Sequence, residues 1–145
     1  VLSEALRSAG LGSQVLIAQF LRGGVNQGPN GAINLCGRLE WLRPAIETCL
    51  QEKILEEHLS LKRKYEEKAI KELWEFCKSR LIEKKIDKIV LDEIGIAISL
   101  GFIEENDLIF MINNRPSSTD IILTGPSIPP KVIEMADQIT ELRCN

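Results

Sequence analysis

The stretch that most constrains the fold is Lys88–Glu93, with the sequence KIVLDE. Its apolar run, Ile89 to Leu91, fits a strand buried on both faces, as strands of a parallel sheet are. The adjacent carboxylates of Asp92 and Glu93 end the run. Because ligands of doubly wound α/β folds lie at the carboxyl ends of the strands, this pair predicts a site that binds Mg²⁺ or performs catalysis. The alternative is that both acids only favour the start of the next helix, where negative charge suits the helix dipole.

Composition places the chain among globular domains of ordinary make-up. It has 145 residues, of which 44% are hydrophobic and 27% are charged, so one domain with its own core is expected. The net charge of -3 and the aromatic content of 5% give no basis for binding nucleic acid or an anionic membrane. No apolar run reaches the length of a membrane span, and no signal peptide is recognisable. We therefore expect neither nucleic acid nor a membrane as a partner.

Cysteine and histidine usage argues against a zinc centre. The cysteines form no C-x-x-C pair, and the chain has a single histidine, His58. Cysteines scattered without the spacing of a disulfide framework indicate reduced thiols, and hence a cytoplasmic protein. The four are Cys36, Cys49, Cys77 and Cys144.

Apolar patterns along the chain alternate between the periods of strands and helices. Short apolar runs predict strands at residues 15–21, 88–92, 119–124 and 138–142. Helical spacing marks residues 2–9, 54–85, 94–100, 104–114 and 129–136. This order predicts an α/β domain with a mostly parallel sheet, in which the four strands are parallel neighbours and helices cover both faces. Parallel pairing would bring Asp92–Glu93 and Thr124–Gly125 to the same end of the sheet.

The long charged segment at residues 54–85 carries one apolar stripe. The stripe comprises Ile70, Leu73, Cys77 and Leu81, and the remaining face is charged and read as solvated surface. We interpret the segment as the crossover helix that leads to the Asp92–Glu93 strand. Cys77 belongs to the apolar stripe, so it is expected to be buried and unreactive.

Two stretches before that helix have weaker patterns. The loop from Gly23 to Gly37 is rich in Gly and Pro, so it predicts either a mobile, lid-like ligand loop or a plain surface connection. Residues 35–50 predict a short helix or turn that ends near Trp41, because Arg43 precedes Pro44 and is biased away from helix. The sequence contains neither G-x-G-x-x-G nor G-x-x-x-x-G-K-[ST].

Four motifs in order resemble the ATP:corrinoid adenosyltransferases. They are VLDEIGIAISLGFI at residues 90–103, INNRP at 112–116, DIILTG at 120–125 and VIEMADQITELR at 132–143. An earlier segment, VLIAQFLRGG at 15–24, resembles the second strand of that family. The resemblance covers roughly residues 1–24 and 87–143, and the block between them matches poorly.

The resemblance implies a fold, two substrates and a set of residues. The family has a P-loop, RecA-like, three-layer αβα fold and transfers the adenosyl group of ATP to the cobalt of a reduced corrinoid. It implies MgATP and a corrinoid as substrates and leaves a homodimer open. Glu93, with Asp92 beside it, would match the acid near Mg²⁺, and Asn114, Arg115 and Gly125 would match residues that bind the nucleotide.

The chain departs from the family pattern in several places. The family's phosphate loop lies just before its first helix, and this sequence starts within that helix at Val1. We therefore expect the first strand, the phosphate loop and the tail past Asn145 to be missing, so that residues 1–145 form a single α/β domain truncated at both ends. Pro126 and Ser127 follow Thr-Gly, where the family usually has Arg.

Three functions are compatible with these residues. The first is MgATP-dependent adenosylation of a corrinoid. The second is a nucleotide-binding protein of the same fold that has lost transfer activity and acts by binding or interaction. The third is a P-loop ATPase that uses ATP for a function other than corrinoid adenosylation. A phosphate-loop motif in the residues ahead of Val1 would favour the first over the second.

Overall fold

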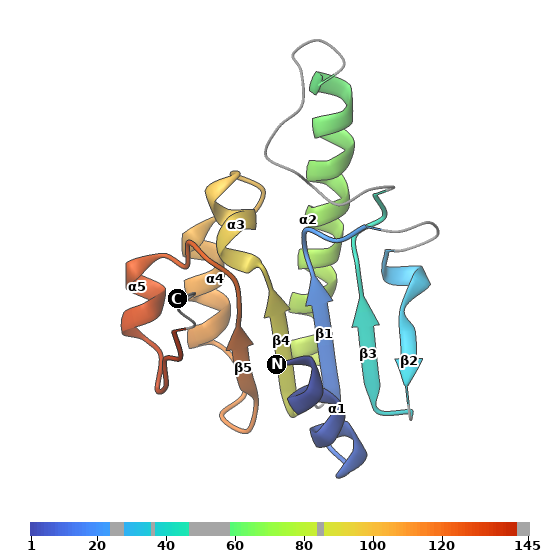
Figure 1. The fold of residues 1–145 in the computed structure, drawn as a ribbon, viewed down its shortest axis with the longest axis vertical. Coiled ribbons are helices and arrows are strands. Elements are labelled where there is room, and N and C mark those ends of the chain that lie inside the picture. The colour runs from blue at the N-terminus through green and yellow to red at the C-terminus, as the bar shows by residue number, and fades with distance from the viewer. Residues whose placement is uncertain (24–27, 36, 47–58, 84–85, 142–145) are drawn as a thin grey trace.

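The computed structural model describes residues 1–23, 28–35, 37–46, 59–83 and 86–141 (Figure 1). Its centre is a five-stranded sheet in the order β2-β3-β1-β4-β5. The strands are β1 (Val15–Gln19), β2 (Ile33–Leu35), β3 (Leu39–Leu42), β4 (Lys88–Asp92) and β5 (Asp120–Leu123). β1 pairs in parallel with β3 and β4, β4 pairs in parallel with β5, and β2 is antiparallel to β3. The predicted α/β class with a mostly parallel sheet is confirmed.

Helices lie on both faces of the sheet, which is compatible with three αβα layers (Figure 1). Helix α1 (Leu2–Gly10) packs on one face, against Val15, Ile17 and Val90. The opposite face packs against the apolar sides of the later helices. These are α2 (Leu59–Glu83), α3 (Ile94–Ser99), α4 (Glu105–Asn113) and α5 (Pro130–Glu134); a 3-10 helix, η1 (Pro29–Gly31), precedes β2.

β4 is buried from both sides, as the KIVLDE stretch predicts. Ile89 and Leu91 point into the larger core under α2, whereas Val90 points toward α1, and all three are fully buried. Burying one such side chain stabilises a fold by about 1.5–3 kcal/mol, so this run fixes β4 near the middle of the sheet. Its two carboxylates are thereby placed at the carboxyl end of a central strand.

The chain reverses direction across the sheet between β1 and β4. After β1 it continues to β2 and β3 on one side, α2 then crosses back, and β4 continues to β5 on the other side. The carboxyl ends of β1 and β4 are therefore neighbours at a topological switch point, where open α/β sheets form a ligand crevice.

Two predictions for residues 23–50 are wrong where the structure describes them. Where the sequence predicted a helix or turn ending near Trp41, the structure has the strand β3. The reason is that β3 pairs with β1 and buries Leu39 and Leu42. The expected loop contains β2, which pairs with β3 through Asn34 and Glu40. Residues 24–27 and 36 of that loop lie outside the described residues, and its mobility stays a prediction.

The predicted strand at residues 138–142 is also wrong over its described part. Residues 138–141 belong to no helix or strand and are all exposed, and residue 142 lies outside the described residues. Ile139 is the apolar side chain of these four and is 59% exposed, so the segment would bury little by joining the sheet. The other three predicted strands are β1, β4 and β5, and they are parallel neighbours as expected.

Cys77 occupies the apolar face of α2, as its stripe predicts. Its side chain is fully buried, and this burial, together with the negative charge of Glu40, raises the pKa of the thiol. We expect labelling of Cys77 by a thiol reagent to be about a hundredfold or more slower in native than in urea-unfolded protein, because reaction requires local opening. Mass spectrometry of the Cys77 peptide measures this separately from other cysteines. Equal rates in both states would contradict the assigned helix face.

Candidate functional site

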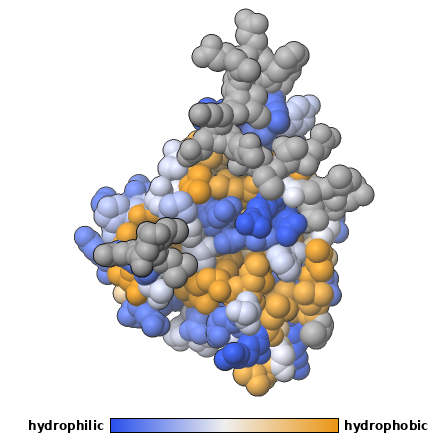
Figure 2. All heavy atoms as spheres, viewed as in Figure 1, coloured by the Kyte–Doolittle hydropathy of each residue, from blue (hydrophilic) through white to orange (hydrophobic). Residues whose placement is uncertain are grey.

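Polar side chains form one row across four strands at the carboxyl end of the sheet. Gln19 pairs with Asp92 in the β1–β4 register, and the ladders of β1 with β3 and of β4 with β5 end one residue before Arg43 and Thr124. Because side chains alternate along strands, all four lie on the face that α1 partly covers. Figure 2 shows hydrophilic surface at this place, above an apolar area. Arg43, Gln19, Asp92 and Thr124 are called the polar row below.

The amide of Gln19 joins the two halves of the polar row. Gln19 is 1% exposed. Its Nε2 donates a 2.8 Å hydrogen bond to Oδ2 of Asp92, while its Oε1 accepts from Nε1 of Trp41 at 2.9 Å and from Nε of Arg43 at 3.0 Å. A buried amide with three partners is well satisfied, and its orientation is fixed by two donors and one acceptor.

The second oxygen of Asp92 is bound from β5. The hydroxyl of Thr124 donates to Oδ1 of Asp92, and the same hydroxyl accepts a 3.4 Å hydrogen bond from the backbone N–H of Glu93. Asp92 is thus anchored at both oxygens, from β1 on one side and from β5 on the other. The prediction that the ends of these two strands meet at one end of the sheet is confirmed.

Glu93 follows in a strained backbone conformation. Its φ of 61° lies in the left-handed region, which costs a non-glycine residue about 1–3 kcal/mol and is typical of functional sites. Gly125 lies against it, so close that a Cβ on Gly125 would be 2.8 Å from Cα of Glu93. The side chain of Glu93 makes no capping hydrogen bond to α3, and it has no hydrogen-bond or ion-pair partner among the described residues. Capping of the following helix therefore does not account for this carboxylate.

The acid pair matches the donor set of a metal bound together with phosphates. In the part of the chain that the structure describes, no three His, Cys, Asp or Glu side chains gather closely enough to hold a metal ion by themselves. Mg²⁺ in nucleotide sites uses one or two carboxylates, phosphate oxygens and water. Asp92 and Glu93 fit that second arrangement, with Glu93 as the available ligand because none of the described residues binds its carboxylate.

Asn114 and Arg115 lie at the opposite end of the sheet. Arg115 donates to the carbonyls of Ile112 at 2.9 Å and Thr119 at 3.3 Å, and Asn114 donates to the carbonyl of Phe110 at 2.8 Å. Thr119 precedes β5, so this group lies where β4 and β5 begin. A strand of four residues separates it from Thr124, which is about 13 Å. The structure therefore does not bring Asn114 and Arg115 together with Asp92, Glu93 and Gly125.

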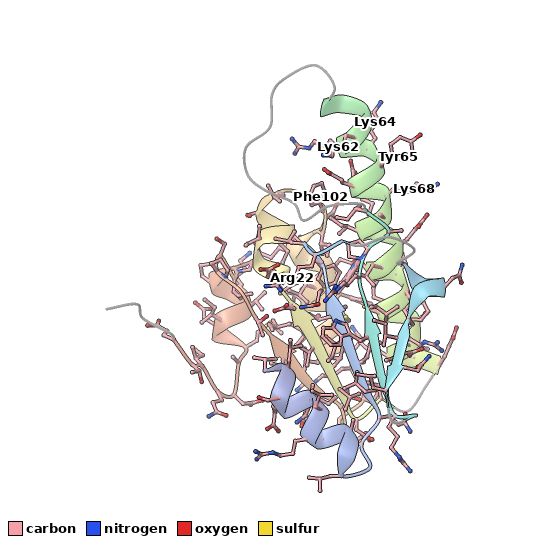
Figure 3. The ribbon with its side chains drawn as sticks, turned by 45° about the vertical axis from the view of Figure 1, so that its right-hand side comes forward. Arg22, Lys62, Lys64, Tyr65, Lys68 and Phe102 are labelled. Atoms are coloured by element: carbon pink, nitrogen blue, oxygen red, sulfur yellow. The ribbon has the colours of Figure 1, made fainter. Side chains whose placement is uncertain are left out.

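Positively charged side chains lie at the same end of the sheet as the acids (Figure 3). Figure 3 shows Arg22 beyond the end of β1, and it shows Lys62 and Lys64 on the part of α2 that extends past the sheet. All three side chains are exposed. Positive charge near a site attracts ligands of the opposite sign, here a polyanion.

Sequence reasoning missed Gln19, Trp41 and Arg43. Gln19 gave a signal, since it is the one polar residue within the apolar run VLIAQFL and must find partners when that run is buried. Trp41 and Arg43 gave none, because their segment was not recognised as a strand. Their proximity to Gln19 depends on the pairing of β3 with β1.

The fold and the polar row define a class of protein. It is an α/β protein with a mostly parallel sheet, whose polar groups gather at the topological switch point, where such sheets bind ligands. No helix within the described residues is both long and apolar enough to cross a bilayer.

The family follows from comparison with known proteins. The family described as ATP:corrinoid adenosyltransferase BtuR/CobO/CobP matches residues 1–145, and the chain belongs to it. The chain is 27% identical over 143 residues to the corrinoid adenosyltransferase of Escherichia coli K12, with 96% of this chain and 66% of that protein covered. It is 27% identical over 139 residues to corrinoid adenosyltransferase CobA of Salmonella typhimurium, with the same coverage. The chain thus spans just under two thirds of the length of these relatives.

A shorter match points to the same family. Over 69 residues the chain is 32% identical to the corrinoid adenosyltransferase of Pseudomonas aeruginosa, which covers 48% of this chain and 34% of that protein.

Proposed function

We propose that the protein binds MgATP at the carboxyl end of its sheet and transfers the adenosyl group to the cobalt of a reduced corrinoid. The observation that carries this proposal is the acid pair at the switch point, with Asp92 anchored at both oxygens and Glu93 left without a partner among the described residues. Membership of the family and the names of its relatives support ATP and a corrinoid as substrates.

Each residue of the acid pair has its own part in this proposal. Glu93 approaches Mg²⁺ and helps to neutralise the triphosphate. Asp92 holds the ends of β1, β4 and β5 together through Gln19 and Thr124, and Gly125 leaves room for the backbone of Glu93. A P-loop, RecA-like fold is part of the same proposal. A nucleotide contact of Asn114 and Arg115 stays a prediction, because it needs ligand at the other end of the sheet.

The chemistry requires few catalytic side chains. Reduced cobalt is itself a strong nucleophile: it attacks the 5′ carbon of ATP, the bond from that carbon to the triphosphate oxygen breaks, and the electron pair leaves with the triphosphate. The protein then contributes mainly by holding ATP with its 5′ carbon accessible and by excluding water. This agrees with a site in which the polar row and the adjacent Glu93 supply two carboxylates and no histidine.

Calorimetry of the full-length protein tests the proposal. We expect saturable MgATP binding that weakens at least tenfold when EDTA removes Mg²⁺, because the free triphosphate then faces the two carboxylates unscreened. We also expect an adenosylated corrinoid, detected by its absorption spectrum, when reduced corrinoid is added. Binding without product would favour a nucleotide-binding protein that has lost transfer activity. Absence of MgATP binding would refute the proposal.

A further inference from the structure

Arg43 is held rigidly at the β3 end of the polar row. Its Nε donates to the buried Oε1 of Gln19 at 3.0 Å, and its guanidinium carbon lies 5.3 Å from the ring centre of Trp41. Its backbone carbonyl accepts a 2.9 Å hydrogen bond from Gly28. The side chain is partly buried. Both the position and the plane of the guanidinium are therefore set before any ligand arrives.

The outer edge of this guanidinium is not used within the described residues. Neither Nη atom of Arg43 has a hydrogen bond or ion pair there. Arg38 and Arg80, by contrast, use theirs: Arg38 binds the carbonyl of Gly12 at 2.6 Å, and Arg80 binds Glu40 at 2.8 Å. An arginine fork fits a phosphate or carboxylate with two parallel hydrogen bonds. Rigid placement combined with unused donors indicates a ligand contact.

Gln19 also keeps Arg43 apart from Asp92. The amide lies between them, donating to the acid and accepting from the arginine, so the two charges do not form an ion pair with each other. The row thus presents a cation at β3 and carboxylates at β4. Two strand spacings separate these strands, which is about 10 Å. A phosphate chain with a bound divalent cation carries the complementary pair of charges.

We propose that Arg43 is a phosphate-binding residue, which contacts the phosphate chain at the side of the crevice away from Glu93. The ligand class is a polyphosphate anion, either free or as part of a nucleoside triphosphate. The inference rests on the proposed function for its link to MgATP, but it makes a separate prediction for inorganic tripolyphosphate, which carries no adenosine.

Titration calorimetry of the full-length protein with tripolyphosphate in the presence of Mg²⁺, and with MgATP, tests this inference. Arg43→Gln should weaken both by about tenfold or more, since it removes a charge-assisted contact. Arg43→Lys keeps the charge but lacks the fork, so it should recover part of the loss. The matched control is Arg38→Gln, which removes the same charge at the other end of β3 and should bind like the parent.

Thermal melts accompany each titration. If Arg43→Gln does not fold, the test rests on Arg43→Lys, which should fold because it retains the positive charge beside Trp41. Affinity of Arg43→Lys for both ligands equal to that of the parent would then overturn the inference.

If the parent binds MgATP and folded Arg43 variants bind it equally, the inference fails while the proposed function stands. If tripolyphosphate binding depends on Arg43 but no corrinoid is adenosylated, the inference stands and the proposed function fails. If the parent binds neither ligand, both fail.

Discussion

Gly125→Ala should lower the free energy of unfolding by about 3 kcal/mol and abolish tight MgATP binding, because it combines backbone strain with a steric clash. The φ of Gly125 is +101°, a region that residues with a Cβ rarely adopt. The added Cβ would also be 2.8 Å from Cα of Glu93, which is backbone and cannot turn away. Relief of the clash therefore requires the turn that carries Glu93 to move.

Gly12→Ala is the matched control for this variant. Gly12 has nearly the same φ, +106°, but a Cβ there would meet nothing within 4 Å. It should therefore show the strain alone, about 1–2 kcal/mol, and leave MgATP affinity as in the parent. Urea unfolding gives the stabilities, and calorimetry gives the affinities. Equal behaviour of the two variants would mean that the approach of Gly125 to Glu93 has no part in the site.

The predictable part of this fold is the part whose patterns are local. β1, β4 and β5 each contain an apolar run, and α2 carries a periodic stripe, so burial of each follows from its own residues. The end at which Asp92 and Thr124 meet then follows from parallel pairing. This reasoning fails for β3, because apolar and polar side chains alternate only weakly along its four residues. The strand is instead stabilised by pairing with β1, which is distant in sequence.

The candidate site likewise contains residues that the sequence indicated and residues that it did not. Asp92, Glu93 and Gly125 were found because the acids end a recognisable strand and the family resemblance placed the glycine beside them. The position of Arg43, and of Trp41 beside it, depends on where β3 lies, and no local pattern placed β3 beside β1. Asn114 and Arg115 came from the resemblance alone. In the structure Arg115 joins α4 to the segment before β5, and Asn114 bonds to a carbonyl of α4.

The hydrogen bond between Gln19 and Asp92 satisfies polar groups that are buried or partly buried. Each would be costly to bury alone, since an unsatisfied buried polar group costs about 1–3 kcal/mol. Together with Trp41 and Thr124 they satisfy one another. The row is therefore stable without ligand, and ligand binding can use the groups left over, namely the carboxylate of Glu93 and the Nη atoms of Arg43.

Glu93→Gln should weaken MgATP binding by about tenfold to a hundredfold while leaving thermal stability unchanged, because in the proposed site the lost charge would contact ligand, and it has no partner among the described residues. Asp92→Asn should act differently. It replaces a carboxylate that accepts hydrogen bonds from Gln19 and Thr124, so it should lower stability by about 1–2 kcal/mol.

The role of Mg²⁺ gives the sharpest test of the Glu93 assignment. If Glu93 acts through the metal, Glu93→Gln should bind ATP more weakly than the parent only when Mg²⁺ is present; in EDTA it should bind ATP as well as the parent or better, because the free triphosphate then faces one carboxylate fewer. Calorimetry with and without EDTA, beside thermal melts of both variants, separates this effect from a general loss of structure. A Glu93→Gln protein that binds MgATP and adenosylates corrinoid like the parent would show that the metal-binding acid lies elsewhere. An equal loss of affinity with and without Mg²⁺ would instead place Glu93 against the nucleotide itself.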